Sequence, residues 1–134
     1  LMVRREAIEA VGLLDEGYFM YAEEVDWCWR IQRAGWPFYC VPAARVIHHG
    51  GASTGQFRSR STLNLWRSRR KLYACFYGPV RRVLAAQIVR LAMQAEARRA
   101  RRAHAAGAID AAEERERIET AEAVRRLFNQ RERG

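Results

Sequence analysis

Residues 17–30 read GYFMYAEEVDWCWR, and this stretch sets the first expectations for the fold and its function. Three carboxylates, Glu23, Glu24 and Asp26, stand close together among large aromatic residues. Burying a charge without a partner is costly, and burial moves a carboxyl pKa toward the range useful for proton transfer. These carboxylates are therefore the first candidates for catalytic residues.

The sequence around the acidic residues predicts a helix over residues 22–34. Side chains four positions apart share one face of a helix, so Asp26 lies beside Arg30, while Glu23 and Glu24 diverge onto adjacent faces. Only part of the acidic trio can then face one ligand. We expect Asp26 and Arg30 to form a structural pair that orients this helix.

On either side of this helix the sequence predicts short elements. A short helix over residues 5–11 is ended by Gly12, and Gly35 ends the acidic helix. Residues 36–42 are rich in β-forming residues and contain two prolines, so they predict a short strand at a sheet edge. Residues 44–47 form a second extended piece that leads into a glycine-rich loop.

The sequence changes character after about residue 58. Helices are predicted over residues 60–77, 80–103 and 109–128, separated by Gly-Pro and by a small-residue break. The last helix has few large apolar residues, so it could pack on its neighbour as a hairpin, mediate self-association or fray. The segment between Trp66 and Arg102 is strongly cationic, because its one acidic residue is Glu96. Its basic residues are Arg67, Arg69, Arg70, Lys71, Arg81, Arg82, Arg90, Arg98, Arg99, Arg101 and Arg102.

Composition limits the possible classes of protein. The 134 residues are 49% hydrophobic, which is enough to bury the core of one domain with an appendage. No apolar run reaches the roughly 18 to 20 residues of a membrane span. The odd cysteine count and the lack of C-x-x-C spacing favour reduced thiols over a disulfide framework or a zinc site. The apolar start without an initiator methionine indicates a fragment of a longer protein.

Several motifs occur in a fixed order along the first half of the chain. They are Gly12-x-x-Asp15-Glu16-x-Tyr18-Phe19-x-Tyr21, Glu23-Glu24-Val25-Asp26-x-x-x-Arg30, Ala34-Gly35-Trp36, Val41-Pro42, and His48 followed by Gly51 and Ser53. This ordered set resembles the acceptor-side half of inverting family-two glycosyltransferases. It is most similar to their rhamnosyltransferase-like and galactofuranosyltransferase-like branches, and the resemblance covers roughly residues 1–77.

The resemblance implies an α/β fold, the C-terminal part of a GT-A fold with short strands, followed by a mainly helical extension. It also implies transfer of a sugar, with inversion, from a nucleotide-sugar donor to a lipid-linked or polysaccharide acceptor. The general base then falls on Glu24, with Glu23 as an acceptor-binding neighbour, although relatives often carry Asp at the second position and the choice between the two stays open. Tyr21 and Trp27 are the corresponding candidates for contact with the acceptor sugar.

The resemblance further places a divalent metal, Mn²⁺ or Mg²⁺, at His48. Imidazole suits Mn²⁺, and it suits Mg²⁺ as one member of an oxygen-rich shell. Ser53, Thr54 and Arg58 follow on the loop that binds the donor diphosphate in relatives, and hydroxyl, backbone N–H and guanidinium groups all suit phosphate oxygens.

Two domains follow from this interpretation. Residues 1–57 are expected to be the acceptor-side part of the catalytic domain, and residues 58–134 a basic helical extension that ends in a helical hairpin. The donor-binding half with its Asp-x-Asp motif is not in this sequence, so we expect the chain alone to be inactive. The expected location is cytoplasmic, peripheral on the inner face of the cell membrane.

A second interpretation makes the chain a non-catalytic basic module for membrane-surface or protein interaction. Its helices would lie on anionic lipid with Trp66, Tyr73, Phe76 and Tyr77 at the interface, or would form a homo-oligomer through the C-terminal helices. Nucleic acid is the least favoured partner, because only charge and a few interleaved aromatics point to it, without a zinc-finger, RNP or helix-turn-helix signature.

Overall fold

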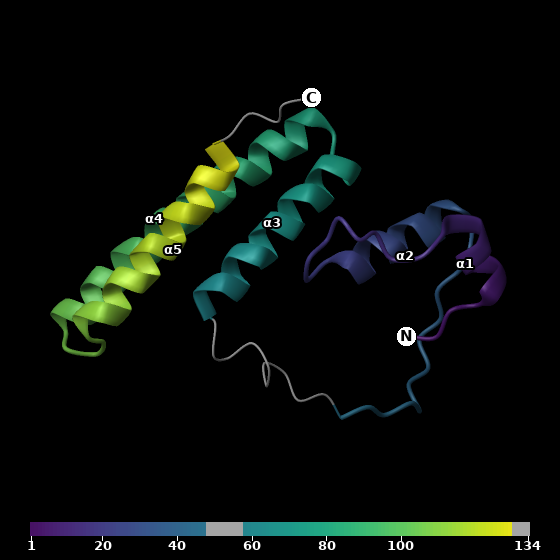
Figure 1. The fold of residues 1–134 in the computed structure, drawn as a ribbon, viewed down its shortest axis with the longest axis horizontal. Helices are drawn as coiled ribbons and strands as arrows, with labels where there is room; N and C mark the ends of the chain where they lie inside the picture. The colour runs from purple at the N-terminus through teal and green to yellow at the C-terminus, as the bar shows by residue number, and fades with distance from the viewer. Residues whose placement is uncertain (48–57, 130–134) are drawn as a thin grey trace.

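The computed structural model describes residues 1–47 and 58–129, and the elements of this part of the chain are helices (Figure 1). Their bounds are Arg5–Val11 (α1), Glu23–Arg33 (α2), Arg58–Phe76 (α3), Pro79–Ala105 (α4) and Ala111–Asn129 (α5). The helices expected around residues 5–11, 22–34, 60–77, 80–103 and 109–128 are all present, the first with the expected bounds and the others with ends shifted by one or two residues.

The expected α/β architecture with short strands is wrong, because the described residues contain helices and no strand. Residues 36–42 and 44–47 are extended or turned, and most of their side chains are exposed. A strand exists only when a neighbouring strand accepts and donates its ladder hydrogen bonds. No such neighbour is present in the described residues, and the β-forming sequence of residues 36–42 therefore stays unpaired.

Helices α1 and α2 pack against each other at the N-terminal end of the chain. The indole N–H of Trp27 donates to the carbonyl oxygen of Gly12 at 2.8 Å, which ties α2 to the end of α1. Gly35 follows α2 with a φ of 86°, a left-handed conformation that favours glycine and ends the helix.

Helices α4 and α5 form a long antiparallel hairpin, and α3 lies along α5 (Figure 1). The hairpin buries small and branched residues, Val89 and Ala100 from α4 and Ala121 and Val124 from α5. Arg117 of α5 crosses to Glu96 of α4, with 2.6 Å between Nη2 and the nearer carboxylate oxygen. This hairpin is held by close backbone approach and by ion pairs more than by large apolar side chains.

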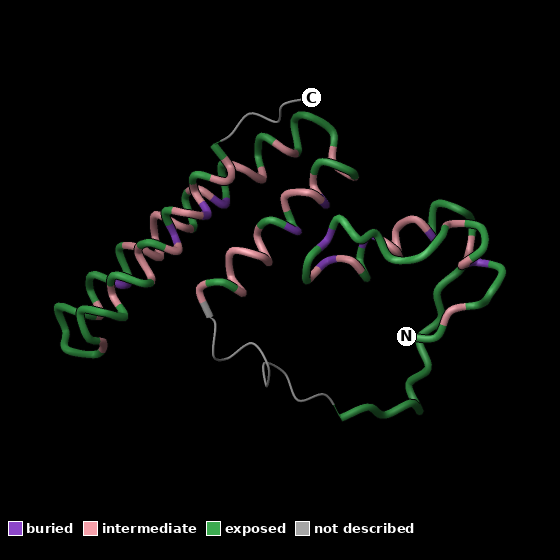
Figure 2. The backbone as a smooth tube through the Cα atoms, viewed as in Figure 1, coloured by how far each residue is buried: buried purple, intermediate pink, exposed green. Residues whose placement is uncertain are grey.

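A small core joins the segment before α2 to the middle of α3. Tyr18, Ala22 and Leu72 are buried together, and the half-buried rings of Trp29 and Phe76 pack on them. Figure 2 shows these buried positions as short patches in a largely exposed backbone. This junction fixes the acidic helix α2 relative to α3.

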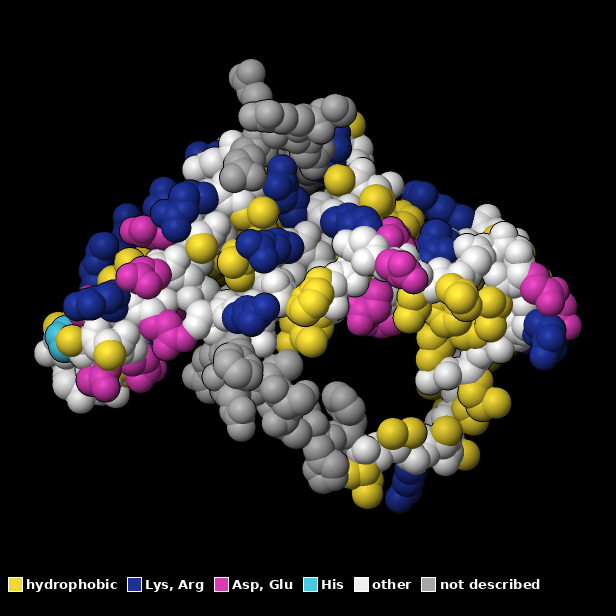
Figure 3. Space-filling view, in the orientation of Figure 1, with side chains coloured by type: hydrophobic (Ala, Val, Ile, Leu, Met, Phe, Trp, Pro, Cys, Tyr) yellow, Lys and Arg dark blue, Asp and Glu magenta, His cyan; other side chains and the backbone are white. Residues whose placement is uncertain are grey.

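The molecule as a whole is open. It exposes 10577 Å², against about 7,200 Å² for a compact monomer of its mass. Figure 3 shows hydrophobic side chains in contact with solvent near α1 and α2, and acidic and basic side chains interleaved along the hairpin. Apolar surface is therefore available for contacts beyond this chain.

Candidate functional site

The structure divides the three acidic residues of α2 by environment. Asp26 is 4% exposed, whereas Glu24 is exposed and Glu23 is intermediate. The Oδ2 atom of Asp26 accepts a hydrogen bond from Nε of Arg30 at 2.9 Å, and Oδ1 accepts a long one from the Tyr18 hydroxyl at 3.4 Å. Asp26 is therefore committed to contacts inside the protein.

Arg30 connects Asp26 to the segment that follows α1. Its Nη1 atom donates to the carbonyl oxygen of Val11 at 2.6 Å, and Nη2 donates to that of Leu13 at 2.9 Å. The rigid fork of a guanidinium can hold three acceptors in one plane. The structure thus brings Asp26 and Arg30 together as one cross-link between α2 and the end of α1.

Glu23 and Glu24 begin α2, where the first backbone N–H groups have no partner inside the helix. Their negative charge is favourable at this end of the helix dipole. Among the described residues no hydrogen bond or ion pair reaches Glu24, and the buried Oε2 atom of Glu23 has no hydrogen-bond partner. The exposed carboxylate of Glu24 is accessible to a ligand, whereas the Oε2 atom of Glu23 is covered by the protein.

The backbone just before α2 is strained. Tyr21 and Ala22 both have a φ of 69°, in the left-handed region that side chains with a Cβ seldom adopt. Such residues cost roughly 1–3 kcal/mol each and persist where the surroundings hold them, often at functional sites. Here the hydroxyl of Ser68 on α3 donates to the carbonyl oxygen of Met20 at 2.7 Å, which fixes the entry to this bend.

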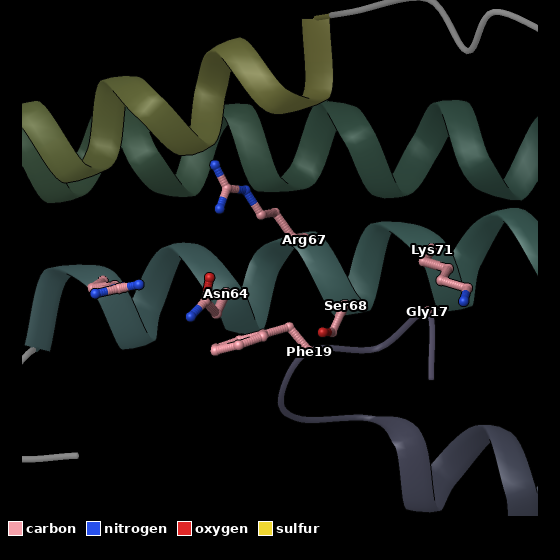
Figure 4. A pocket seen from close by; sticks show the side chains of 7 residues that line it. Gly17, Phe19, Asn64, Arg67, Ser68 and Lys71 are labelled. Atoms are coloured by element: carbon pink, nitrogen blue, oxygen red, sulfur yellow. The ribbon is translucent and has the colours of Figure 1, made fainter. Parts of the chain in front are cut away.

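A cavity of about 300 Å³ lies between this bend and α3 (Figure 4). The residues that line it are Gly17, Phe19, Arg60, Asn64, Arg67, Ser68 and Lys71. A Cβ at Gly17 would displace the amino group of Lys71, the flexible end of that side chain. The lining residues include three cations and no carboxylate, which makes the cavity electropositive.

Asp15 and Lys71 close one end of this cavity. Their carboxylate and amino groups are 2.7 Å apart, and the backbone N–H of Gly17 also donates to Asp15 at 2.7 Å. The hydrogen bond from Lys71, followed by that from Gly17, lowers the pKa of Asp15 below its ordinary value. The carboxylate of Asp15 therefore stays ionised and holds the amino group in place.

The phenol of Tyr18 is buried below the same bend. The amino group of Lys71 lies 4.3 Å from the centre of its ring. Burial, followed by the negative charge of Asp26, raises the pKa of Tyr18 far above its ordinary value. Tyr18 is therefore a neutral hydrogen-bond donor to Asp26 at neutral pH.

The structure describes the side chains of two of the other residues that the sequence proposed for the site, Tyr21 and Trp27. Trp27 is tied to α1 through its indole N–H, and Tyr21 lies at the bend directly before Glu23. His48, Ser53 and Thr54 lie outside the described residues, and so does the side chain of Arg58, the first residue of α3. Their roles in binding a metal and the donor diphosphate stay predictions.

No three His, Cys, Asp or Glu side chains in residues 1–47 and 58–129 gather as ligands for a metal ion. No helix in the same residues combines the length and apolar character needed to span a membrane.

Part of the chain is similar to curated sugar transferases. Over 56 residues it is 52% identical to N-acetylglucosaminyl-diphospho-decaprenol L-rhamnosyltransferase of two Mycobacterium tuberculosis strains, a match that covers 42% of this chain and 18% of the relative. Over 61 residues it is 36% identical to rhamnosyltransferase WbbL of Escherichia coli K12, covering 46% of this chain and 23% of the relative.

The matched relatives are named rhamnosyltransferases. This chain spans about a fifth of their length, so the similarity supports a glycosyltransferase relationship for the matched segment. No family model matches the chain, and no solved structure does.

Sequence reasoning missed the contribution of α3 to the site. Arg60, Asn64, Arg67 and Lys71 follow one another at intervals of four, three and four residues, which places them on one helical face. This spacing is visible in the sequence. What the sequence did not reveal is that this face lies against the bend before Glu23.

Proposed function

We propose that this chain forms the acceptor-side part of a glycosyltransferase that moves a sugar from a nucleotide-activated donor to a lipid-linked or glycan acceptor. The names of the relatives suggest L-rhamnose as the sugar and an N-acetylglucosaminyl-diphospho-lipid as the acceptor. The observation that carries the proposal is that, in the described part of the chain, Asp26 has partners inside the protein and the other two acidic residues of α2 do not. Asp26 is locked by Arg30, whereas Glu23 and Glu24 keep carboxylate oxygens without partners among the described residues.

These two groups match the needs of sugar transfer with inversion. The acceptor hydroxyl oxygen forms a bond to the anomeric carbon, the bond from that carbon to the donor diphosphate breaks, and a carboxylate takes the hydroxyl proton. Glu24, exposed at the start of α2, suits the role of base, and a base of this kind contributes about 10²–10⁴ in rate. Glu23, which lies beside Glu24 at the start of α2, would bind or orient the acceptor.

The metal and the donor site belong to the same proposal. A divalent ion bound at His48 would offset the charge that builds on the leaving diphosphate. Ser53, Thr54 and Arg58 would contact the diphosphate oxygens. We propose a cytoplasmic enzyme, peripheral on the inner face of the membrane, and expect that the 134-residue chain alone does not transfer sugar.

The test uses the full-length protein that contains this sequence, with three carboxylate-to-amide variants. Glu24→Gln should lower kcat about 10²–10⁴-fold and leave donor binding unchanged. Glu23→Gln should mainly raise KM for the acceptor. Glu9→Gln, an exposed position on α1, is the matched control and should be fully active.

An active Glu24→Gln enzyme would remove Glu24 as the base, and loss of kcat in Glu23→Gln would then assign that role to Glu23. Sugar transfer by the isolated chain at near full-length rates would refute the expectation that it is inactive.

A second candidate function rests on a stripe of exposed apolar residues along α4. The residues are Val80 (70% exposed), Val83 (59%), Leu84 (57%), Ile88 (66%) and Leu91 (63%). Positions 80, 83, 84, 88 and 91 follow the spacing of one face of an α-helix. Such a face, on a helix with seven arginines and one glutamate, suits a bilayer that contains anionic lipid.

The aromatic residues proposed for this role from the sequence are used inside the protein. Trp66 packs edge-on against Phe128 with ring centres 5.9 Å apart, and Phe76 packs on Trp29 at 4.3 Å. Tyr73 and Tyr77 stack on each other at 4.9 Å. The aliphatic stripe of α4 therefore replaces them as the surface proposed to contact lipid.

Flotation with vesicles that contain anionic phospholipid measures this function. The double variant Leu84→Gln/Ile88→Gln should bind vesicles at least about tenfold more weakly, since each buried aliphatic side chain contributes about 1.5–3 kcal/mol. Leu13→Gln/Val46→Gln, at exposed apolar positions outside α4, is the control. Equal binding of both double variants, or concentration-dependent dimers in place of vesicle binding, would refute lipid as the partner of the stripe.

A further inference from the structure

We propose that the cavity between residues 17–20 and α3 binds a diphosphate group. Its volume of about 300 Å³ is large enough for this group, and its lining residues carry three cationic side chains, an amide and a hydroxyl without any carboxylate. An electropositive cavity with several N–H donors is the usual environment of a bound phosphate.

The donors come from one face of α3. Arg60, Asn64, Arg67 and Lys71 line the cavity from α3. In Figure 4, Phe19 of the bend lies beside Asn64 and Ser68, whereas Arg67 extends from α3 toward the hairpin. A polar and cationic face would be expected to point to solvent, yet this one borders another segment of the protein. A ligand with negative charge accounts for this arrangement.

Two of the cations are available to a ligand. Lys71 is held by Asp15, and the Ser68 hydroxyl is used by the carbonyl of Met20. Among the described residues no hydrogen bond or ion pair holds Arg60 or Arg67, and both side chains are exposed. Figure 4 shows Arg67 extending from α3 toward the hairpin, and rotation of its long side chain would bring the guanidinium over the cavity that it lines. Guanidinium groups bind phosphate oxygens in pairs.

The cavity is continuous with the proposed catalytic residues. The segment that lines it, residues 17–20, leads through the two left-handed residues directly into Glu23 and Glu24. The origin of the diphosphate rests on the proposed function, because both the nucleotide-sugar donor and the diphospho-lipid acceptor would carry one. The binding chemistry itself does not depend on sugar transfer.

The experiment titrates the ¹⁵N-labelled 134-residue chain with inorganic pyrophosphate at low salt, with NMR and calorimetry as readouts. Pyrophosphate should shift the amide signals of Gly17, Asn64 and Ser68. The double variant Arg60→Gln/Arg67→Gln should bind at least about tenfold more weakly, because charge-assisted hydrogen bonds are lost.

The matched control is Arg98→Gln/Arg101→Gln, which removes the same charge from exposed positions on α4. It should keep the affinity of the unchanged chain within about twofold. Equal weakening in both double variants, or pyrophosphate shifts that spread over α4 and spare residues 17–20, would overturn the proposal. The amide shifts of the unchanged chain decide the question even if a variant fails to fold.

Two further ligands distinguish the source. Geranyl diphosphate represents a lipid diphosphate, and uridine diphosphate represents the donor. If geranyl diphosphate binds more tightly than uridine diphosphate, and the Arg60→Gln/Arg67→Gln variant loses this binding, the cavity is assigned to the acceptor. If uridine diphosphate binds more tightly and the variant loses that binding, the cavity is assigned to the donor. If the chain binds pyrophosphate and the Glu24→Gln enzyme is active, only the catalytic role of Glu24 is refuted. If the Glu24→Gln enzyme is inactive and pyrophosphate does not bind, only the diphosphate site in the cavity is refuted.

Discussion

Replacing Asp26 by asparagine removes one negative charge from the buried cross-link between α2 and the end of α1. Loss of one partner of a buried ion pair costs about 3–5 kcal/mol, and a hydrogen bond to a charged group contributes about 1.5–3 kcal/mol. Arg30 keeps two carbonyl acceptors, and its side chain is 28% exposed, so solvent screens part of the loss. We therefore expect Asp26→Asn to lower the free energy of unfolding by about 2 kcal/mol.

The assay is urea unfolding followed by far-UV circular dichroism at neutral pH. The midpoint should fall while the slope with urea stays constant, which identifies a change in stability and not in the denatured state. Glu24→Gln, at an exposed carboxylate on the same helix, is the control and should change stability by less than about 0.5 kcal/mol. In an Arg30→Gln background the cost of Asp26→Asn should shrink, because the two residues interact directly.

Equal stability of Asp26→Asn and Glu24→Gln would refute the structural role of Asp26. Unchanged cost of Asp26→Asn in the Arg30→Gln background would show that the ion pair is not the source of the effect. Under the proposed function, a sugar-transfer assay should also separate the two variants, since Glu24→Gln should lose turnover without losing stability.

Three other perturbations follow from contacts described above. The folded-state pKa of Asp15 lies below its ordinary value of 3.8, so its contribution to stability is present above that value and is lost as the pH falls through the lowered pKa. Urea midpoints of the unchanged protein and Asp15→Asn should therefore differ at neutral pH and converge only below the lowered pKa of Asp15. Val124 is fully buried in the hairpin, so Val124→Ala should cost about 1–3 kcal/mol, measured by the same unfolding assay, whereas Val80→Ala at an exposed position should cost little. Burial raises the pKa of Tyr18 above its ordinary value of 10.0, so a Tyr18→Phe difference spectrum in an ultraviolet absorbance titration should show Tyr18 ionising above that value, and ionisation of Tyr18 at its ordinary value would contradict its burial.

Local sequence signals were enough to locate the helices. Gly12 and Gly35 end α1 and α2, and Gly78 with Pro79 separates α3 from α4. These residues act through their own backbone preferences, so no knowledge of the tertiary structure is needed to interpret them. The spacing of four between Asp26 and Arg30 likewise follows from helix geometry alone.

Features that depend on distant contacts were not predictable in the same way. The sequence of residues 36–42 favours a strand, but strand formation requires a second strand that the described residues do not supply. The aromatics of α3 resemble a membrane-facing set, yet Trp66 has a partner 62 positions further along the chain, in Phe128. The cavity beside Gly17 arises only when α3 lies against the bend.

The two left-handed residues before α2 also bear on how this site can be inherited or engineered. Tyr21 and Ala22 occupy backbone angles that cost an isolated peptide roughly 1–2 kcal/mol per residue. Their shape is held by Ser68 and Leu72, which lie on a different helix far along the chain. A transplant of residues 17–30 to another scaffold would therefore relax and redirect Glu23 and Glu24. The acidic helix and α3 must be moved together, and sequence changes in one are expected to be compensated in the other.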